Sequence, residues 1–222
     1  MNSAWFFKTG PGEYGEGDQF LGVTVPNQRK VAKKYKNLPL SDLEKLLGSP
    51  WHEERLSALF ILVLQFKKAD EPKQKEIYEF YLKHTSRINN WDLVDSSASY
   101  IVGAYLSEHQ ELLPVLDKLA ESNLLWKRRI AMISTAYFLS KGEPDITIKL
   151  AEKLLYDPDD LIHKAVGWML REIGKRCDKQ LLIDFLNQHA HEMPRTMLRY
   201  SIEHLDDPTR KSYLEMKTPM SS

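Results

Sequence analysis

Apolar residues recur at helical spacing along most of the chain. The clearest run follows Pro50, where one helix face would carry Leu56, Leu59, Phe60, Val63 and Leu64. The same spacing continues through residues 109–120, 124–140, 145–156, 160–176, 178–189 and 195–205. No segment alternates apolar and polar residues for long enough to predict a strand. The pattern therefore predicts an all-α protein of about eleven or twelve helices, most of them short.

Residues typical of helix ends divide this pattern into elements. Ser41 and Glu44 form an S-x-x-E capping box, which predicts a helix that starts at this point. Gly48 stands where the C-terminus of that helix is expected. Pro50 and Pro72 each occupy a position suited to the first residue of a following helix.

The predicted helices repeat with a period of about 36 residues. Residues near the start of every second helix stand in register at Arg55, Asp92, Arg129, Lys164 and Arg199. Such a period, with two helices in each unit, is typical of an α-solenoid of HEAT-like helical repeats. We therefore expect one domain over residues 1–222, with an N-terminal arm at 1–25 and helical repeats at 26–217. In this register the second helices start near residues 51, 91, 124, 160 and 194.

Positive charge collects along one edge of the predicted array, although 31 Lys and Arg residues balance 31 Asp and Glu residues. Helix N-termini add free N–H donors and partial positive charge, which suits phosphate oxygens. The cations in or beside the first turns of the second helices are Arg55, Lys127, Arg128, Arg129, His163, Lys164, Arg195 and Arg199. The helix that begins at Pro26 adds Arg29, Lys30, Lys33, Lys34 and Lys36, with no acid among them. The sequence thus predicts a curved solenoid whose concave face is basic and suited to phosphate groups.

One acid interrupts the apolar pattern. Asn89 or Asn90 can cap a helix on which Trp91 and Asp95 lie one turn apart. Asp95 stands in a column of the register that is otherwise filled by Ala58, Met132, Gly167 and Ile202. Two interpretations remain open at this point. Asp92 and Asp95 are ordinary acids of a helix N-terminus, or Asp95 has a function, because burying an unpaired carboxylate is costly.

Several other kinds of site lack support in the sequence. The seven histidines show no metal-binding spacing, and Cys177 is the single cysteine and has no neighbouring nucleophile motif. The glycine cluster at 10–17 has acids between its glycines and lacks the Lys-Ser/Thr end of a phosphate loop. We expect it to belong to an N-terminal arm that packs its aromatic residues on the domain. We also expect no cofactor, no metal, no membrane span and a cytoplasmic location.

Four strings of the sequence are informative together: Gly22-Val23-Thr24-Val25-Pro26 with Arg29, Trp91-Asp92-Leu93-Val94-Asp95, Trp126-Lys127-Arg128-Arg129-Ile130-Ala131, and His163-Lys164-Ala165-Val166-Gly167-Trp168-Met169-Leu170-Arg171-Glu172. Through these strings the chain resembles the AlkD-type DNA alkylation-repair family, whose members are HEAT-like-repeat DNA glycosylases acting on alkylated purines. The resemblance covers roughly residues 20–205. By position, the resemblance implies that Asp95 is the catalytic acid and that Trp91 and Trp168 face the lesion. It implies that Arg129 is the catalytic-site arginine, with Arg128 as the alternative, and our repeat register prefers Arg129.

The resemblance also implies a reaction and a partner. The reaction is hydrolysis of the N-glycosidic bond of cationic N3- or N7-alkylated purines, such as 3-methyladenine and 7-methylguanine, while the lesion stays stacked in duplex DNA. No lysine is marked as a Schiff-base nucleophile, so we expect a monofunctional glycosylase without lyase activity, acting as a monomer. The residues expected to bind DNA are Arg128, Lys127, His163, Lys164, Arg171, Arg55, Arg199, Arg29 and Lys33.

Two other functions remain open from the sequence. A non-catalytic HEAT-like DNA-binding module would share the basic edge but would not need Asp95. A helical-repeat scaffold for other proteins would more naturally present an apolar or mixed concave face.

Overall fold

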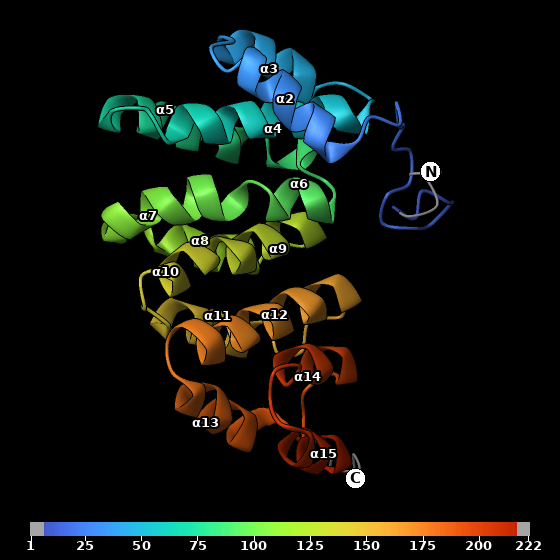
Figure 1. The fold of residues 1–222 in the computed structure, drawn as a ribbon, viewed down its shortest axis with the longest axis vertical. Coiled ribbons are helices and arrows are strands. Elements are labelled where there is room, and N and C mark those ends of the chain that lie inside the picture. Colours follow the sequence, from blue (N-terminus) through green and yellow to red (C-terminus); the bar gives the residue numbers. More distant parts are fainter. Residues whose placement is uncertain (1–6, 217–222) are drawn as a thin grey trace. The chain divides into compact units, whose positions relative to one another are not determined.

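The computed structural model describes residues 7–216, and all of the regular secondary structure in this range is helical (Figure 1). The nearest approach to a strand in these residues is one isolated bridge between Gln19 and Trp51. The prediction of an all-α fold is confirmed. Over the same range, no helix has the length and apolar character needed to cross a membrane. The chain divides into two compact units, residues 1–105 and residues 106–222.

The first unit is organised around α4 (His52–Phe66), which contacts four neighbouring helices. These neighbours are α2 (Val25–Lys34), α3 (Leu40–Leu47), α5 (Glu71–Lys83) and the short α6 (Trp91–Asp95). Ten of the fifteen residues of α4 are buried, so this helix forms the core of the unit rather than one amphipathic side of it. A π-helical turn at Ser99–Gly103 follows α6 and packs on α4 and α5, and the boundary between the two units falls within the next helix, α7 (Ala104–Glu108).

The second unit is organised around α12 (Asp160–Arg176), which packs against α9 (Leu125–Ser134), α13 (Lys179–His189) and α14 (Arg195–Ser201). The remaining helices are α8 (Pro114–Ala120), α10 (Ala136–Ser140), α11 (Asp145–Lys153) and α15 (Asp207–Glu215). Gly167 permits the close approach of α12 and α14. A Cβ atom at this position would lie 2.5 Å from the Met197 carbonyl oxygen and 2.6 Å from the Tyr200 Cβ atom.

The repeat register located the second helices correctly. They begin at His52, Trp91, Leu125, Asp160 and Arg195, each within one residue of the predicted start. Local end signals were less reliable. Gly48 does cap the C-terminus of α3, Asn90 caps α6, and α5 has its proline, Pro72, in the first turn.

Two of the predicted helix starts were wrong. The capping box was wrong because α3 already begins at Leu40, after Pro39, which leaves Ser41 inside the helix without a capping hydrogen bond. Pro50 was also misassigned, since Trp51 precedes the first residue of α4 and adopts an extended conformation.

Candidate functional site

The short helix α6 presents an indole and a carboxylate side by side. The Asn90 side chain accepts a hydrogen bond from the Trp91 amide at 2.8 Å and thereby starts the helix. Leu93 and Val94 are fully buried and fix the inner face of the helix. Trp91 and Asp95 lie one helical turn apart, and both are half-buried. Their side chains therefore share the face of α6 that is not buried in the core.

The two acids of α6 have different surroundings. Asp92 is buried, and one of its carboxylate oxygens lies 2.8 Å from Nε2 of His52 on α4. Asp92 thus pairs with a residue of the preceding repeat. Asp95 instead lies close enough to α5 to influence Tyr81. Burial and the nearby Asp95 charge raise the pKa of the Tyr81 phenol, against the opposing effect of its hydrogen bond with Ser97.

A buried charged network connects the N-terminal arm to α4 and α6. One carboxylate oxygen of Asp18 lies 3.0 Å from Nδ1 of His52 and accepts from Asn90 at 3.1 Å, while the other accepts from Arg55 at 2.5 Å. Burial by itself would lower the pKa of His52, but hydrogen bonds to Asp18 and Asp92 raise it to about 9. Burial likewise acts to raise the pKa of Asp18, yet its bonds to His52 and Arg55 hold this pKa below its ordinary value.

The arm is also hydrogen-bonded to Glu53 at the start of α4. The Glu53 carboxylate accepts three backbone hydrogen bonds, from the amides of Leu21, Gly22 and Val23. Gly22 takes a left-handed conformation, with φ of 81°, which suits glycine. These bonds hold the arm against the end of the first unit at which α4 and α6 begin (Figure 1).

Aromatic stacking continues this contact to the α6 indole. The Phe7 ring stacks on Phe20 and on Trp91, with centroid distances of 5.0 and 5.5 Å, and it lies 4.8 Å from the His52 ring. The expectation of an arm that packs its aromatic residues on the domain is thus confirmed for Phe7 and Phe20. The arm therefore contacts both helices, α4 through the His52 ring and α6 through the Trp91 ring.

Asp18, His52 and Glu53 were not predicted from the sequence. The two partners of His52 lie 34 and 40 residues away in the chain, so no local spacing indicates the network. Arg55 was predicted to lie on the DNA-binding edge. In the structure Arg55 is only 2% exposed, and its guanidinium group donates hydrogen bonds to the Asp18 carboxylate and to the Ser49 carbonyl oxygen. Its guanidinium group is therefore not available to a phosphate in this structure.

The adjacent arginines of α9, in the second unit, have different partners. Arg128 is buried and donates to both carboxylate oxygens of Asp157, at 2.6 and 3.3 Å, to Asp159, and to the Ser122 carbonyl oxygen. This neutralised guanidinium group does not suit the expected DNA contact. Arg129 is also buried, and its Nη1 donates to the Leu161 carbonyl oxygen at 2.5 Å. The preference of the repeat register for Arg129 over Arg128 stays a prediction.

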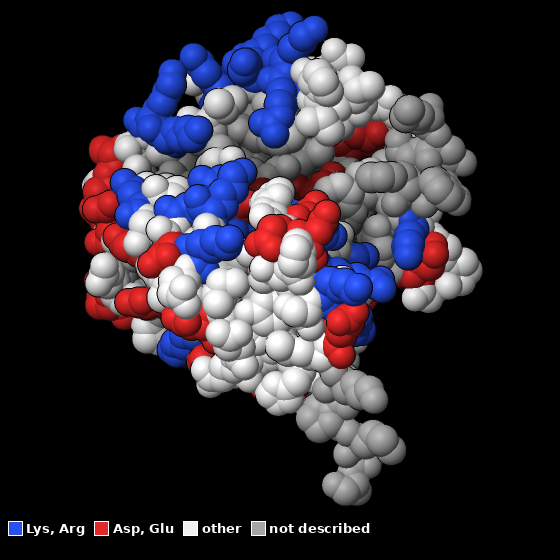
Figure 2. All heavy atoms as spheres, turned by 60° about the horizontal axis from the view of Figure 1, so that its bottom comes forward, with Lys and Arg blue, Asp and Glu red and all other residues white. Residues whose placement is uncertain are grey.

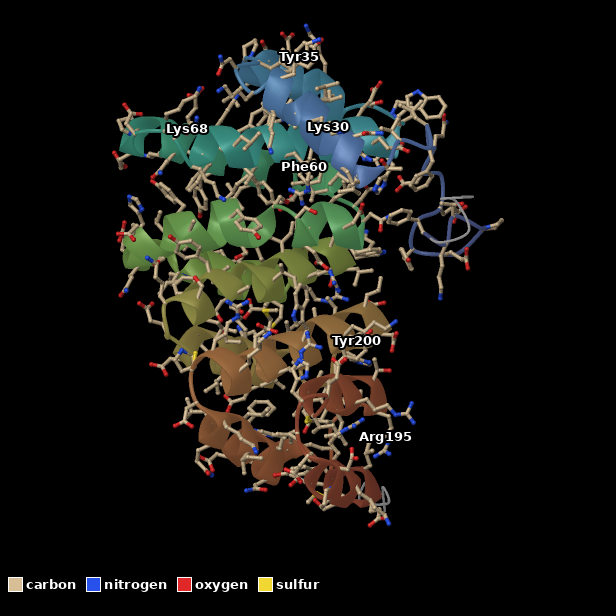
Figure 3. All side chains as sticks on the ribbon, in the orientation of Figure 1. Lys30, Tyr35, Phe60, Lys68, Arg195 and Tyr200 are labelled. Carbon is tan, nitrogen blue, oxygen red and sulfur yellow. The ribbon has the colours of Figure 1, made fainter. Side chains whose placement is uncertain are left out.

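The other cations of the second unit that were predicted to line the DNA-binding edge lie at or near the surface of α9, α12 and α14. His163 bonds to the Asp157 carbonyl oxygen, and Lys164 pairs with Asp160 at 2.7 Å. Trp168 is half-buried and lies one turn after Lys164 on the same face of α12. Arg171 pairs with Glu203 and, at 3.7 Å, with Glu172. Lys127 is half-buried on α9, whereas Arg195 and Arg199 are exposed on α14, where Figure 3 labels Arg195.

In the first unit, Arg29 and Lys33 are both exposed on α2, and the Arg29 guanidinium group lies 4.1 Å from the centre of the Phe60 ring. Within residues 7–216, no group of three or more His, Cys, Asp or Glu side chains has the arrangement of a metal site.

Comparison with protein families identifies a matching family. The profile of a family described as "DNA alkylation repair enzyme" matches residues 1–205. No curated protein matches the chain in a sequence search.

Solved structures show the same fold. A predicted DNA alkylation repair enzyme from Enterococcus faecalis is 16% identical, with a TM-score of 0.70 over 92% of this chain and 93% of that chain. AlkD2 from Streptococcus mutans is 21% identical, with a TM-score of 0.60 over 84% of this chain and 92% of that one. The protein smu.31 from Streptococcus mutans UA159 is 22% identical, with a TM-score of 0.58 over 82% and 93% of the two chains.

Proposed function

Because the chain belongs to the DNA alkylation repair enzyme family, we propose that it hydrolyses the N-glycosidic bond of cationic N3- or N7-alkylated purines in duplex DNA. The observation that carries this proposal is the arrangement of α6. Trp91 and the half-buried Asp95 share one face of this helix, while the neighbouring acid Asp92 is held by His52. We therefore assign the chemistry to the half-buried Asp95 rather than to the buried Asp92.

A carboxylate is the group that this reaction requires. An N3- or N7-alkylated purine already carries a positive charge, so it leaves without a general acid. The developing charge lies on the sugar, which becomes oxocarbenium-like, as in glycoside hydrolysis. The Asp95 carboxylate would stabilise this charge and hold the attacking water. No cofactor is needed for such a step.

The tryptophans would recognise the positive charge of the lesion. A cation placed over an indole face gains roughly 0.5–2 kcal/mol, depending on its solvation. Trp91 supplies such a face beside Asp95, and Trp168 supplies one on α12. An uncharged purine would lack this attraction, which favours alkylated over normal bases.

We assign the phosphate contacts to cations that are not neutralised in the core. In the first unit these are Arg29 and Lys33, and in the second unit Lys127, His163, Lys164, Arg171 and Arg199. Arg129 is buried, so we assign it by its place in the repeat register and not by its exposure: it would make a charge-assisted hydrogen bond to a phosphate beside the lesion and fix the sugar. We leave out Arg55 and Arg128 because both are buried in ion pairs with Asp18 and with Asp157 and Asp159.

The test is direct. The purified protein is incubated with duplex DNA that has been methylated on purine nitrogens, and the released bases are identified and timed under single-turnover conditions. We expect free 7-methylguanine and 3-methyladenine, with strand breaks appearing only after alkali, as for a monofunctional glycosylase. Binding of the same duplex without base release would instead assign the chain to a non-catalytic DNA-binding module.

A further inference from the structure

A second basic surface lies in the first unit, on α2 and beyond the C-terminal end of α4. It consists of Lys30, Lys34, Lys36, Lys67 and Lys68, and we call it the lysine surface. All five side chains are exposed, and none has a carboxylate within 4.0 Å among residues 7–216. Figure 2 shows Lys and Arg side chains gathered at the top of the view, where α2 lies, and Figure 3 shows Lys30 on α2 and Lys68 beside the end of α4.

This surface borders an open groove of about 590 Å³. Lys36 and Lys68 both line the groove, together with the apolar residues Leu38 and Leu64. The Gln65 side chain holds residues 36–38 against α4, because it donates to the carbonyl oxygens of Lys36 at 2.9 Å and Leu38 at 2.7 Å. The lysines therefore border a fixed depression rather than separate mobile loops.

Two exposed tyrosines stand among the lysines. Tyr35 and Tyr100 are each 46% exposed. The Lys34 ammonium group lies 5.2 Å from the Tyr35 ring centre, and the Lys67 ammonium group lies 5.3 Å from that of Tyr100. Lysines at helix C-termini are favoured by the helix dipole, which accounts for Lys34 and Lys67 singly. The helix dipole does not account for five unneutralised cations on one surface. Each of these lysines repels the others, and only dissolved salt screens this repulsion.

We propose that the lysine surface binds the phosphodiester backbone of nucleic acid at a site separate from α6. Lys67 and Lys68 follow the C-terminal end of α4, whereas His52, which holds Asp92 of α6, lies at its first turn. A helix of fifteen residues is about 22 Å long, so the two sites bind different parts of a strand. The proposal rests on DNA being the substrate of the proposed function, but not on any step of base excision.

Phosphodiester groups fit these residues better than a membrane or an acidic protein. A membrane-binding helix needs a continuous apolar face opposite its cations, whereas the inner residues Gln28 and Ala32 of α2 are buried in the unit. A phosphate backbone repeats its charge at short intervals and can neutralise cations spread over several elements. Exposed aromatic rings between such cations are typical of surfaces on which bases of a single strand stack.

Lysine acetylation measured by mass spectrometry tests the proposal directly. The wild-type protein is treated with an amine-acetylating reagent alone, with an undamaged 30-base-pair duplex, and with a 30-nucleotide single strand. We expect slower acetylation of Lys34, Lys36, Lys67 and Lys68 when nucleic acid is bound. Lys45 and Lys211 serve as internal controls, because their side chains are 78% and 77% exposed and each pairs with an acid.

Salt dependence gives an independent measurement. The double variant Lys67→Ala/Lys68→Ala should flatten the slope of log K against log salt by about one unit for each lysine that touches a phosphate. The double variant Lys45→Ala/Lys211→Ala removes the same charge and should leave the slope unchanged. The variant Tyr35→Ala/Tyr100→Ala distinguishes the source of the phosphates. If the variant binds only the single strand more weakly, the natural ligand is a single strand whose bases stack on the tyrosines. If the variant binds the single strand and the duplex as the wild type does, the ligand is a duplex held by its phosphates.

The outcomes separate this proposal from the proposed function. Protection of the four lysines in a protein that releases no base would support the lysine surface and refute the glycosylase. Base release with unprotected lysines and an unchanged salt slope would overturn the lysine surface alone. Protection by polyglutamate but not by DNA would also overturn it and assign the surface to an acidic protein.

Discussion

The Nε2 atom of His52 lies 2.8 Å from a carboxylate oxygen of Asp92, at the start of the helix that carries Asp95. The Nδ1 atom of the same ring lies 3.0 Å from Asp18 in the arm. A histidine that donates to a carboxylate from each ring nitrogen is positively charged. The position of α6 relative to α4 and the arm therefore depends on a protonated, buried imidazole.

The first prediction concerns the effect of pH on stability. The pKa of His52 is raised from 6.5 to about 9 in the folded protein, so its contribution is fully present below pH 6.5 and is lost as pH rises through 9. The shift corresponds to a loss on the order of 3 kcal/mol. Melting temperatures measured from pH 6 to pH 10 should fall across this window. The His52→Asn variant should start lower and show a much smaller decline, and parallel declines would contradict the assignment.

Asp18 should be more important for stability than an exposed acid. In Asp18→Asn, the positive charges of His52 and Arg55 stay buried with one carboxylate fewer, and breaking a buried pair in this way typically costs about 3–5 kcal/mol. The control is Asp42→Asn, which removes a surface partner of Lys45 and should cost less than about 1 kcal/mol. Chemical denaturation of both variants measures the difference, and equal losses would show that the network does not hold the arm.

Two glycines of α12 should respond differently to alanine. At Gly167 a Cβ atom would lie 2.5 Å from the Met197 backbone carbonyl oxygen, so α14 must move, and we expect a loss of roughly 1–3 kcal/mol. At Gly174 the three nearest atoms all belong to the Leu182 side chain, from Cδ2 at 2.7 Å to Cγ at 3.6 Å, so a smaller adjustment of one side chain can make room. The gain in helix propensity, about 1 kcal/mol, should then offset most of the strain in Gly174→Ala. Comparable melting temperatures for the two variants would refute the tight contact at Gly167.

The sequence predicted the repeats well because each repeat is a local unit with its own apolar face. The five second helices start where the register placed them. It predicted the roles of individual cations less well, since exposure depends on partners far away in the chain. Arg55 pairs with Asp18, 37 residues before it, and Arg128 pairs with Asp157, 29 residues after it. Periodicity places a side chain on a helix face, but it does not reveal a carboxylate brought there by the arm or by another helix.

Binding of undamaged duplex DNA should distinguish an exposed lysine from a buried arginine. Lys164 is partly exposed, and its acidic partner among the described residues is Asp160 on its own helix, which a phosphate can replace. The Lys164→Ala variant should flatten the slope of log K against log salt by about one unit. Arg128→Ala should leave the slope unchanged but lower the melting temperature, because it leaves Asp157 buried without its cation. A flattened slope for Arg128→Ala would return this residue to the DNA interface.

The last prediction separates the two acids of α6. Asp95→Asn keeps the shape of the side chain but removes the charge that would stabilise an oxocarbenium-like sugar. This variant should fold, bind DNA as well as the wild type, and lose base release by a factor on the order of 10² or more, or about 2.7 kcal/mol of transition-state stabilisation. Single-turnover release of 7-methylguanine measures this loss.

Asp92→Asn is the matched control, since it makes the same chemical change three residues earlier in the same helix. The Asp92 carboxylate is bound by His52, so its loss should lower the melting temperature and leave residual turnover. The two variants should therefore show opposite profiles: one stable and inactive, the other unstable and partly active. Wild-type rates for Asp95→Asn would refute the catalytic assignment, because no charge on α6 other than Asp95 is placed on the face of Trp91. A non-catalytic DNA-binding module would then be the better interpretation of the chain.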